Sequence, residues 1–207
     1  MSVNRFIAKQ LSNPSGIGGK LVFSVMNRQN RQLYEDVIRL LSPAESDNIL
    51  DIGCGNGNVL NIVASRFDCT LAGIDFSRSA IKSALSRNRK FVNSGRMNLA
   101  CQDMSRLPFP DSSFDKVYSI NTVYFWDNLA DTLTEIRRVL KPNGLFLNAL
   151  FTNETLDKIP FTQVGYARYT PEELIGAEKN IGFASCIVPV FNGKAYCVVY
   201  HKEARTE

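Results

Sequence analysis

Three glycines at alternate positions, directly after a short apolar run, constrain this chain more than any other feature. The run Ile49–Ile52 contains Asp51, and Gly53, Gly55 and Gly57 follow it. An apolar run that breaks into glycines is typical of a buried strand that turns sharply into a helix and leaves backbone N–H groups uncovered. Glycines also allow a ligand to approach the main chain, because they carry no Cβ. The segment therefore predicts a binding turn for a nucleoside-bearing ligand.

The glycine spacing excludes two common phosphate-binding loops. The dinucleotide fingerprint G-x-G-x-x-G requires a third glycine where this chain has Asn58 or Leu60, depending on the frame. The phosphate loop G-x-x-x-x-G-K-[ST] also fails, because no Lys-Ser or Lys-Thr follows the glycines. The remaining pattern is Asp-x-Gly-x-Gly-x-Gly. Its carboxylate, Asp51, would repel a pyrophosphate and attract a positively charged ligand.

Further motifs follow this loop in order along the chain. They are Leu71-Ala-Gly-Ile-Asp75-Phe-Ser, Asp103 leading into Leu107-Pro-Phe-Pro-Asp-Ser-Ser-Phe-Asp115, Ile120-Asn121, and Arg138-Val-Leu-Lys-Pro-Asn-Gly144. Together they resemble the core of class I S-adenosylmethionine-dependent methyltransferases over residues 49–151. The pattern is most similar to the small-molecule group that includes the ubiquinone and menaquinone biosynthesis methyltransferases. S-adenosylmethionine carries an ammonium and a sulfonium, so its charge suits a carboxylate in the loop.

The resemblance implies a set of cofactor-binding residues. Gly53 and Gly55 would lie nearest the methionine part, and Asp51 would attract its ammonium directly or through water. Asp75, at the end of the second predicted strand, could accept both ribose hydroxyls, and Asp103 would accept the adenine amine. The Met104 backbone N–H would bind a ring nitrogen, and Phe76 would lie against the adenine or in the core. The full set is Asp51, Gly53, Cys54, Gly55, Gly57, Asp75, Phe76, Asp103, Met104 and Asn121.

Several of these residues have a purely structural alternative. The glycines could serve only the turn between strand and helix, and Asp103 could be a surface loop residue. Asp75 could cap the next helix, although Ser77 is also a candidate cap. Cys54 is interpreted as a small loop residue and not as a nucleophile, because no sequence neighbour would lower the pKa of its thiol.

An aromatic segment, Asn121-Thr-Val-Tyr124-Phe125-Trp126, follows the predicted strand 116–120. Ligands bind at this end of parallel strands in open α/β sheets. The rings could attract a sulfonium through cation–π contacts, shape an acceptor pocket or pack the following helix. Asn121 would lie near the methionine part or the acceptor. The segment lacks the prolines of the Asn-Pro-Pro-Tyr motif of nucleobase amino-methyltransferases, which disfavours that activity. The predicted acceptor-binding residues are Tyr124, Phe125, Trp126, Tyr166 and Tyr169.

Candidate bases are few. The single histidine, His201, falls in the last predicted strand, where a solvated strand end is expected. Methyl transfer from a sulfonium can rely on proximity, which supplies about 7–11 kcal/mol. An acceptor that is already nucleophilic is therefore favoured. Tyr34 and Tyr124 are weak candidates for a catalytic base, and no metal site is expected.

Composition and charge limit the function classes. Of the 207 residues, 44% are hydrophobic and 21% are charged, as in ordinary globular proteins. No apolar run approaches the roughly 18 residues of a membrane span, and the N-terminus lacks the apolar core of a secretion signal. Five cysteines without a C-x-x-C pair favour reduced thiols and a cytoplasmic protein. The net charge of +4 makes nucleic acid an unlikely partner, with a solvated helix face as the favoured interpretation of the basic clusters.

Alternating strands and helices predict an α/β fold with a mostly parallel sheet and one reversed strand. The resemblance implies a Rossmann-like, doubly wound sheet of seven strands with helices on both faces. Predicted strands cover 48–52, 70–74, 97–101, 116–120 and 145–150, and 184–190 with 195–201 form a hairpin around Asn192-Gly193. Pro142-Asn143-Gly144 should end a helix over 128–140, and Thr170 to Glu173 predicts a capping box. One domain over 1–207 is expected: a helical lid (1–40), a cofactor-binding core (45–151), an acceptor-side insertion (152–170), and a helix with the hairpin (171–207).

The leading hypothesis is methyl transfer from S-adenosylmethionine to a small molecule, with S-adenosylhomocysteine as the second product and the methylated atom (N, O, S or C) left open. One alternative is an RNA or protein methyltransferase that uses the basic N-terminal region. Another is a non-catalytic S-adenosylmethionine-binding protein. A monomer and a homodimer both remain open.

Overall fold

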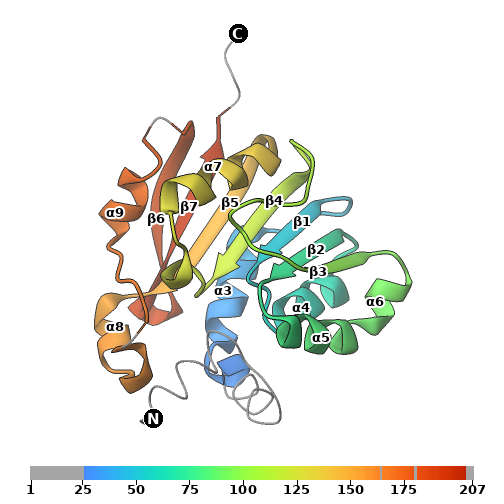
Figure 1. The fold of residues 1–207 in the computed structure, drawn as a ribbon, viewed down its shortest axis with the longest axis horizontal. Coiled ribbons are helices and arrows are strands. Elements are labelled where there is room, and N and C mark those ends of the chain that lie inside the picture. The colour runs from blue at the N-terminus through green and yellow to red at the C-terminus, as the bar shows by residue number, and fades with distance from the viewer. Residues whose placement is uncertain (1–25, 164, 180, 204–207) are drawn as a thin grey trace.

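The computed structural model describes residues 26–163, 165–179 and 181–203, and its centre is a seven-stranded sheet in the order β3-β2-β1-β4-β5-β7-β6 (Figure 1). The strands are β1 (Asn48–Ile52), β2 (Thr70–Asp75), β3 (Met97–Cys101), β4 (Phe114–Ile120), β5 (Leu140–Phe151), β6 (Phe183–Val190) and β7 (Ala195–Lys202). Strands β1 to β5 pair in parallel, and β7 is antiparallel to both β5 and β6. The predicted fold class, with one reversed strand, is confirmed.

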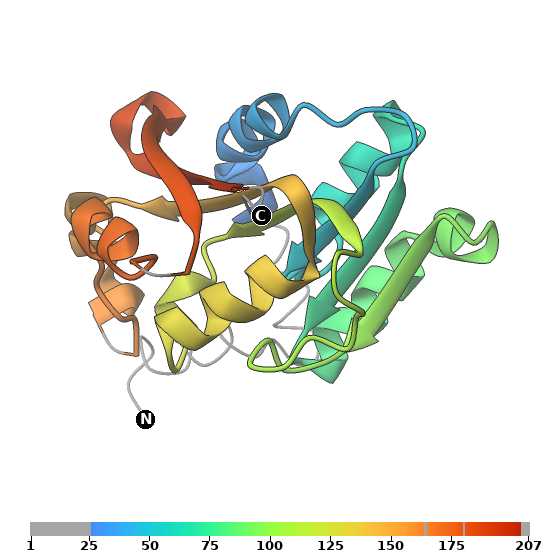
Figure 2. The same cartoon turned by 90° about the horizontal axis from the view of Figure 1, so that it is seen from above.

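Helices cover both faces of the sheet. They are α3 (Arg31–Leu41), α4 (Asn58–Arg66), α5 (Arg78–Arg87), α6 (Arg89–Asn93), α7 (Leu129–Val139), α8 (Asn153–Asp157) and α9 (Pro171–Gly176). Leu33 of α3 and Val63 of α4 belong to one hydrophobic core, and Leu133 of α7 and Leu174 of α9 belong to the other. Seen from above, α3 and α7 lie on opposite sides of the sheet (Figure 2). Central strands buried on both faces are typical of parallel sheets.

Side-chain caps mark the starts of several helices, and two of them, Ser77 and Thr170, were predicted. Asn128 caps α7, since its side chain accepts hydrogen bonds from Ala130 N and Asp131 N. Thr170 and Glu173 form the predicted capping box at the start of α9. Helix α9 ends at Gly176. Capping residues in the sequence therefore predicted where α5 and α9 begin.

The start of β5 differs from the prediction. Helix α7 ends at Val139 and the strand begins at Leu140, so Pro142-Asn143-Gly144 lies inside β5. Leu140 pairs with Phe114, and the register shifts between Phe114 and Lys116. This irregularity accommodates Asn143, whose φ is 61°. An Asp115–Lys141 ion pair of 2.8 Å joins the two strands there.

The N-terminal segment is described only from Met26 onward, so the predicted short helix over 1–12 and most of the predicted lid lie outside the described residues. Residues 26–29 are helical, and a turn at Asn30 separates them from α3. At the other end, β6 and β7 form the predicted hairpin, joined by a short turn over Phe191–Gly193. Within the described ranges, no helix has the length and apolar character that crossing a membrane requires.

Candidate functional site

The glycine loop is fixed to the end of β2 by backbone hydrogen bonds. Gly53 N and Cys54 N both donate to Ile74 O, at 2.8 and 2.9 Å. Gly53, Gly55 and Gly57 have φ angles of 77°, 54° and 68°, in the left-handed region that favours glycine. The loop therefore has the predicted form, a tight turn between a strand and a helix.

The reason for two of the glycines differs from the prediction. A Cβ on Gly53 would lie 2.3 Å from Thr122 Cγ2, and a Cβ on Gly57 would lie 2.5 Å from Asn88 Nδ2. Neighbouring side chains of the protein, and not a ligand, occupy the space beside these two positions. Gly53 and Gly55 line the cavity described next, whereas Gly57 does not.

A cavity of about 710 Å³ opens beside the loop, at the carboxyl ends of β1, β2 and β4. It brings together many of the predicted residues: Tyr34, Gly53, Gly55, Asp75, Phe76, Asp103, Met104, Asn121, Phe125 and Trp126. It does not bring in Asp51, Cys54, Gly57, Tyr124, Tyr166 or Tyr169 as lining residues. The last three were predicted to bind the acceptor, and they lie outside the wall of this cavity.

Helix α7 and the turn before it contribute to the cavity wall, which was not predicted from the sequence. Asp127, Asp131 and Glu135 line the cavity. Asp131 and Glu135 lie four residues apart on one face of α7, and Asp127 lies in the turn just before it. That periodicity was a usable signal, because the helix follows a strand whose carboxyl end was already assigned to the site. Met26, Asn30 and Gln102 were missed as well, and no motif marks them.

Asp75 connects the loop with α5. Its Oδ2 accepts a hydrogen bond from Gly55 N at 2.9 Å, and its Oδ1 accepts one from Ser77 N at 2.8 Å. Burial raises the pKa of the carboxyl, and the two hydrogen bonds act in the opposite direction. Ser77 is the cap of α5. A carboxylate has about four acceptor positions, so each oxygen retains capacity for a ligand hydroxyl.

Asp51 is buried beneath the loop, with 4% of its surface exposed. Burial raises its pKa to about 8, the Asp75 charge adds to the rise, and the Tyr118 hydroxyl opposes it. Tyr118 is its neighbour on β4 in the parallel register. Burial also raises the pKa of the Cys54 thiol. This agrees with the interpretation of Cys54 as a loop residue and not as a reactive thiolate.

The cavity has a strongly asymmetric charge. Asp75, Asp103, Asp127, Asp131 and Glu135 line it, whereas no Lys, Arg or His of the described ranges does. Asp51, with its raised pKa, is buried and does not line the cavity. Glu135 is paired with Arg138 outside the cavity wall. A cavity lined by carboxylates and by no cationic side chain of the described ranges favours a ligand that brings positive charge. Within the described ranges, no three or more His, Cys, Asp or Glu side chains are grouped so that they could hold a metal ion.

None of the tyrosines near the site is suited to accept a proton at neutral pH. Burial raises the pKa of Tyr34 to about 12, and that of Tyr166 also to about 12. Burial raises the pKa of Tyr124 further above its ordinary value. These hydroxyls can donate hydrogen bonds, but their phenolate forms are strongly disfavoured.

The aromatic segment belongs partly to the core. Trp126 is 5% exposed, stacks on Phe146 at 6.4 Å, and donates from Nε1 to Thr122 Oγ1 at 3.2 Å. Phe125 packs edge-on against Tyr166 at 4.8 Å. Both Phe125 and Trp126 still reach the cavity wall. Their packing therefore gives the wall a fixed, apolar section.

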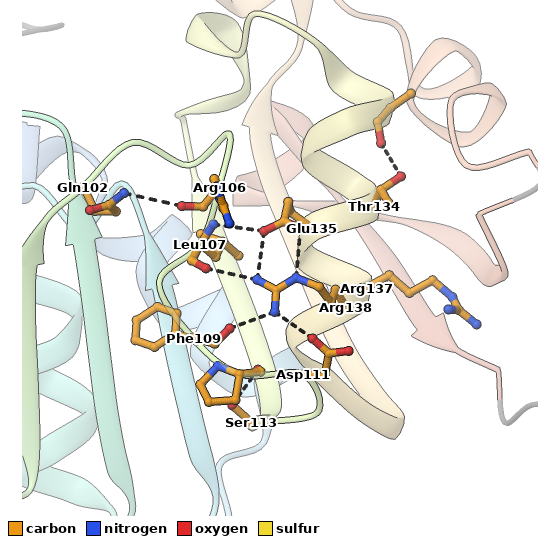
Figure 3. A network of polar contacts seen from close by, with 12 residues as sticks. Gln102, Arg106, Leu107, Phe109, Asp111, Ser113, Thr134, Glu135, Arg137 and Arg138 are labelled. Atoms are coloured by element: carbon orange, nitrogen blue, oxygen red, sulfur yellow. Dashed lines mark hydrogen bonds and ion pairs between the residues drawn. The ribbon is translucent and has the colours of Figure 1, made fainter.

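A guanidinium holds the segment between β3 and β4, which carries Asp103 and Met104, against α7. Figure 3 shows Arg138 between the carboxylates of Glu135 and Asp111. Its nitrogens also donate to Leu107 O at 3.0 Å and Phe109 O at 2.8 Å. Glu135 in turn accepts from Leu107 N at 3.0 Å. The network fixes one wall of the cavity.

Replacing Arg138 by methionine is expected to lower the free energy of unfolding by about 2–4 kcal/mol, since the change removes several charge-assisted hydrogen bonds of a half-buried group. Arg39→Met is the matched control. It removes an ion pair with Asp36 that is exposed on the arginine side, and it should cost less than about 1 kcal/mol. Urea unfolding measures both. A stability loss no greater for Arg138→Met than for Arg39→Met would contradict the role of Arg138 in holding this segment against α7.

Comparison with known proteins agrees with this geometry. Residues 50–148, slightly less than half of the chain, match the family model of a methyltransferase domain. The glycine loop, Asp75, the segment held by Arg138, and Asn121 all lie within this stretch.

Relatives and solved structures extend the likeness. A 24-methylenesterol C-methyltransferase of Oryza sativa subsp. japonica is 32% identical over 59% of this chain and 34% of its own length. An O-methyltransferase of Pyrenophora dematioidea is 32% identical over 53% of this chain and 41% of its own length. The chain thus spans well under half the length of these relatives. A chain of the complex that contains the Haloferax volcanii Trm112 methyltransferase activator has the same fold, with a TM-score of 0.80, 18% identity, and coverage of 98% of this chain and 100% of that one.

Proposed function

We propose that this protein transfers a methyl group from S-adenosylmethionine to a small-molecule acceptor. The observation that carries the proposal is the charge of the cavity. Carboxylates line it at the carboxyl ends of the parallel strands, and no cationic side chain of the described ranges faces it. A ligand with both a sulfonium and an ammonium suits such a site, whereas a pyrophosphate does not.

The residues present fit this cofactor. In the proposal, Asp75 binds the ribose hydroxyls, Asp103 and the Met104 backbone bind adenine beside Phe76, and Asp51 favours the ammonium. Gly53 and Gly55 give the loop the shape that exposes its backbone, with Cys54 and Gly57 as structural members. Asn121 faces the methionine part or the acceptor. S-adenosylmethionine, when bound, supplies a methyl group on a positively charged sulfur that is a good leaving group.

In this reaction the protein would hold the donor and the acceptor close together in a cavity with an apolar wall. Phe125 and Trp126 give the cavity an apolar wall, and aromatic faces near a sulfonium contribute roughly 0.5–2 kcal/mol. Tyr34 and Tyr124 hold their protons too firmly to act as bases. We therefore infer an acceptor that is nucleophilic without proton transfer to the protein, so that proximity carries the catalysis.

The finer parts of the proposal rest on the motifs. The ordered motifs favour a small-molecule enzyme of the ubiquinone and menaquinone type, and five cysteines with none in a disulfide favour a cytoplasmic location. The two relatives named above methylate carbon and oxygen respectively according to their names, so the proposal specifies no acceptor atom. The predicted acceptor residues Tyr166 and Tyr169 do not line the cavity, and Tyr166 enters the proposal only through its packing against Phe125.

The test uses Asp75→Asn. Calorimetry should show micromolar S-adenosylmethionine binding to the natural protein and binding about 10- to 100-fold weaker for the variant, because hydrogen bonds to a charged group contribute about 1.5–3 kcal/mol. Asp131→Asn removes an equal charge from the same cavity and should change the affinity less than threefold. Equal affinities of the natural protein and Asp75→Asn would refute the assignment. A labelled methyl donor with a metabolite extract then tests transfer, and the absence of any labelled product would favour a non-catalytic binder.

A further inference from the structure

The Tyr124 hydroxyl connects two strand ends behind the cavity. It accepts a hydrogen bond from Phe151 N, at the end of β5, at 2.7 Å. It also lies 3.1 Å from Asn121 Oδ1, just past the end of β4. Tyr124 is 3% exposed and does not line the cavity, whereas Asn121 does. Tyr124 thus contacts a lining residue from behind the wall.

The position of one proton sets the orientation of the Asn121 amide. A tyrosine hydroxyl has a single proton to donate, and the Phe151 N–H already occupies one of its lone pairs. With the Asn121 oxygen facing Tyr124, the hydroxyl proton has an acceptor. If the amide were reversed, two donors would face the hydroxyl oxygen and its buried proton would be unpaired, which is costly. Burial also raises the Tyr124 pKa, so the proton stays on the hydroxyl.

The backbone holds the same side chain in place. Asn121 has a φ of 58°, a left-handed conformation that asparagine tolerates better than most residues. Its N–H donates to Ala149 O at 2.8 Å. Its neighbour Thr122 closely approaches Gly53 of the glycine loop. The Asn121 NH₂ group, which has no hydrogen-bond partner within the described ranges, is therefore held at the cavity near that loop.

We propose that the Asn121 amide donates a hydrogen bond to an oxygen atom of the bound ligand, and that Tyr124 is the positioning residue that points the donor at it. The inference rests on the proposed function. The oxygen belongs either to the carboxylate of the donor's amino-acid part or to the methyl acceptor. The first source is favoured, because a ligand carboxylate in a cavity lined by Asp and Glu needs a neutral donor where no cationic side chain faces it.

The experiment compares two donors that differ only in that carboxylate: S-adenosylmethionine and its decarboxylated form, measured by calorimetry. Asn121→Asp replaces the NH₂ donor by an acceptor of the same shape. It should weaken S-adenosylmethionine binding at least tenfold while leaving binding of the decarboxylated donor unchanged or tighter. Tyr124→Phe frees the amide to turn and should weaken only the carboxylate-bearing donor, by about threefold or more.

Asn128→Asp is the matched control. It adds the same charge to the same cavity, and aspartate keeps the helix cap of α7. The ratio of the two donor affinities should therefore change much less than in Asn121→Asp. Thermal unfolding confirms that each variant is folded, and Asn121→Asp alone decides the proposal if Tyr124→Phe does not fold.

The remaining outcomes separate the two sources of the oxygen. Unchanged donor affinities with at least tenfold slower label transfer to a metabolite extract in Asn121→Asp would place the oxygen on the acceptor and support the amide as donor. Equal losses for both donors, or no change in binding and transfer, would overturn the proposal. Failure of the natural protein to bind either donor would instead refute the proposed function.

Discussion

Gly53→Ala is expected to weaken S-adenosylmethionine binding about 100-fold or more and to destabilise the fold. Two independent costs act at this position. Alanine is strained at a φ of 77°, and its Cβ would lie 2.3 Å from Thr122 Cγ2. Backbone strain of this kind costs about 1–3 kcal/mol. The loop can relieve the contact only by moving, and a displaced loop no longer presents its backbone to the cavity.

Gly95 provides a matched control for this prediction. Its φ is 78°, but a Cβ there would have no atom within 4 Å. Gly95→Ala should therefore show only the cost of backbone strain and leave S-adenosylmethionine binding unchanged. Adding Thr122→Ser to Gly53→Ala removes Cγ2 and should restore part of the affinity. Stability and S-adenosylmethionine affinity are measured by urea unfolding and calorimetry for the natural protein, the two alanine variants and the double variant. Equal losses of affinity in Gly53→Ala and Gly95→Ala would contradict the role of the contact with Thr122.

The second large effect is a pH dependence of cofactor binding that depends on Asp51. Its pKa is about 8 in the protein alone, mainly because of burial. A bound ammonium would favour the charged carboxylate and lower this pKa. Binding below pH 8 should then release a proton, and the affinity should rise by up to tenfold per pH unit before it levels off above about pH 8. The rise between pH 6 and pH 8 would approach 100-fold.

The same group affects stability with a defined sign. Its pKa is raised in the folded protein above the unfolded value of about 3.9. Its contribution to the free energy of unfolding is therefore fully present below about pH 4 and is lost as the pH rises through 8. Asp51→Asn should remove the loss of stability that occurs as the pH rises through 8, and it should also remove the pH dependence of S-adenosylmethionine binding.

Calorimetry at pH 6.5, in two buffers with different ionisation enthalpies, measures the released proton directly. The natural protein should release close to one proton on binding, and Asp51→Asn should release none. Asp75→Asn serves as a second reference, because the Asp75 charge contributes to the raised pKa of Asp51. Proton release by the natural protein that Asp51→Asn retains would show that another group titrates.

Local signals predicted most of the fold. Apolar runs predicted β1 and β3 with their observed bounds, and the side chains of Ser77 and Thr170 cap the helices at which they were expected. The start of β5 was wrong because it depends on pairing between Leu140 and Phe114, which are far apart in the sequence. Asparagine and glycine inside that strand are tolerated only because the irregular register accommodates them.

The site was predicted less completely than the fold. Motif positions identified Asp75, Asp103 and Asn121, which the structure brings to one cavity. Sequence could not tell which rings of the segment over 121–126 face that cavity, because a short turn over Val123–Phe125 buries Tyr124 behind it. The need for glycine at position 53 was recognised, but its cause was not visible, since Thr122 approaches only in the folded chain.

A crystal structure of the protein with S-adenosylhomocysteine at saturating concentration tests the account most directly. We expect the adenosyl group in the cavity beside the glycine loop, with the ribose hydroxyls on Asp75 and the adenine between Phe76 and Met104. An adenosyl group bound elsewhere, or a cavity without it under conditions where calorimetry shows saturation, would contradict the central claim.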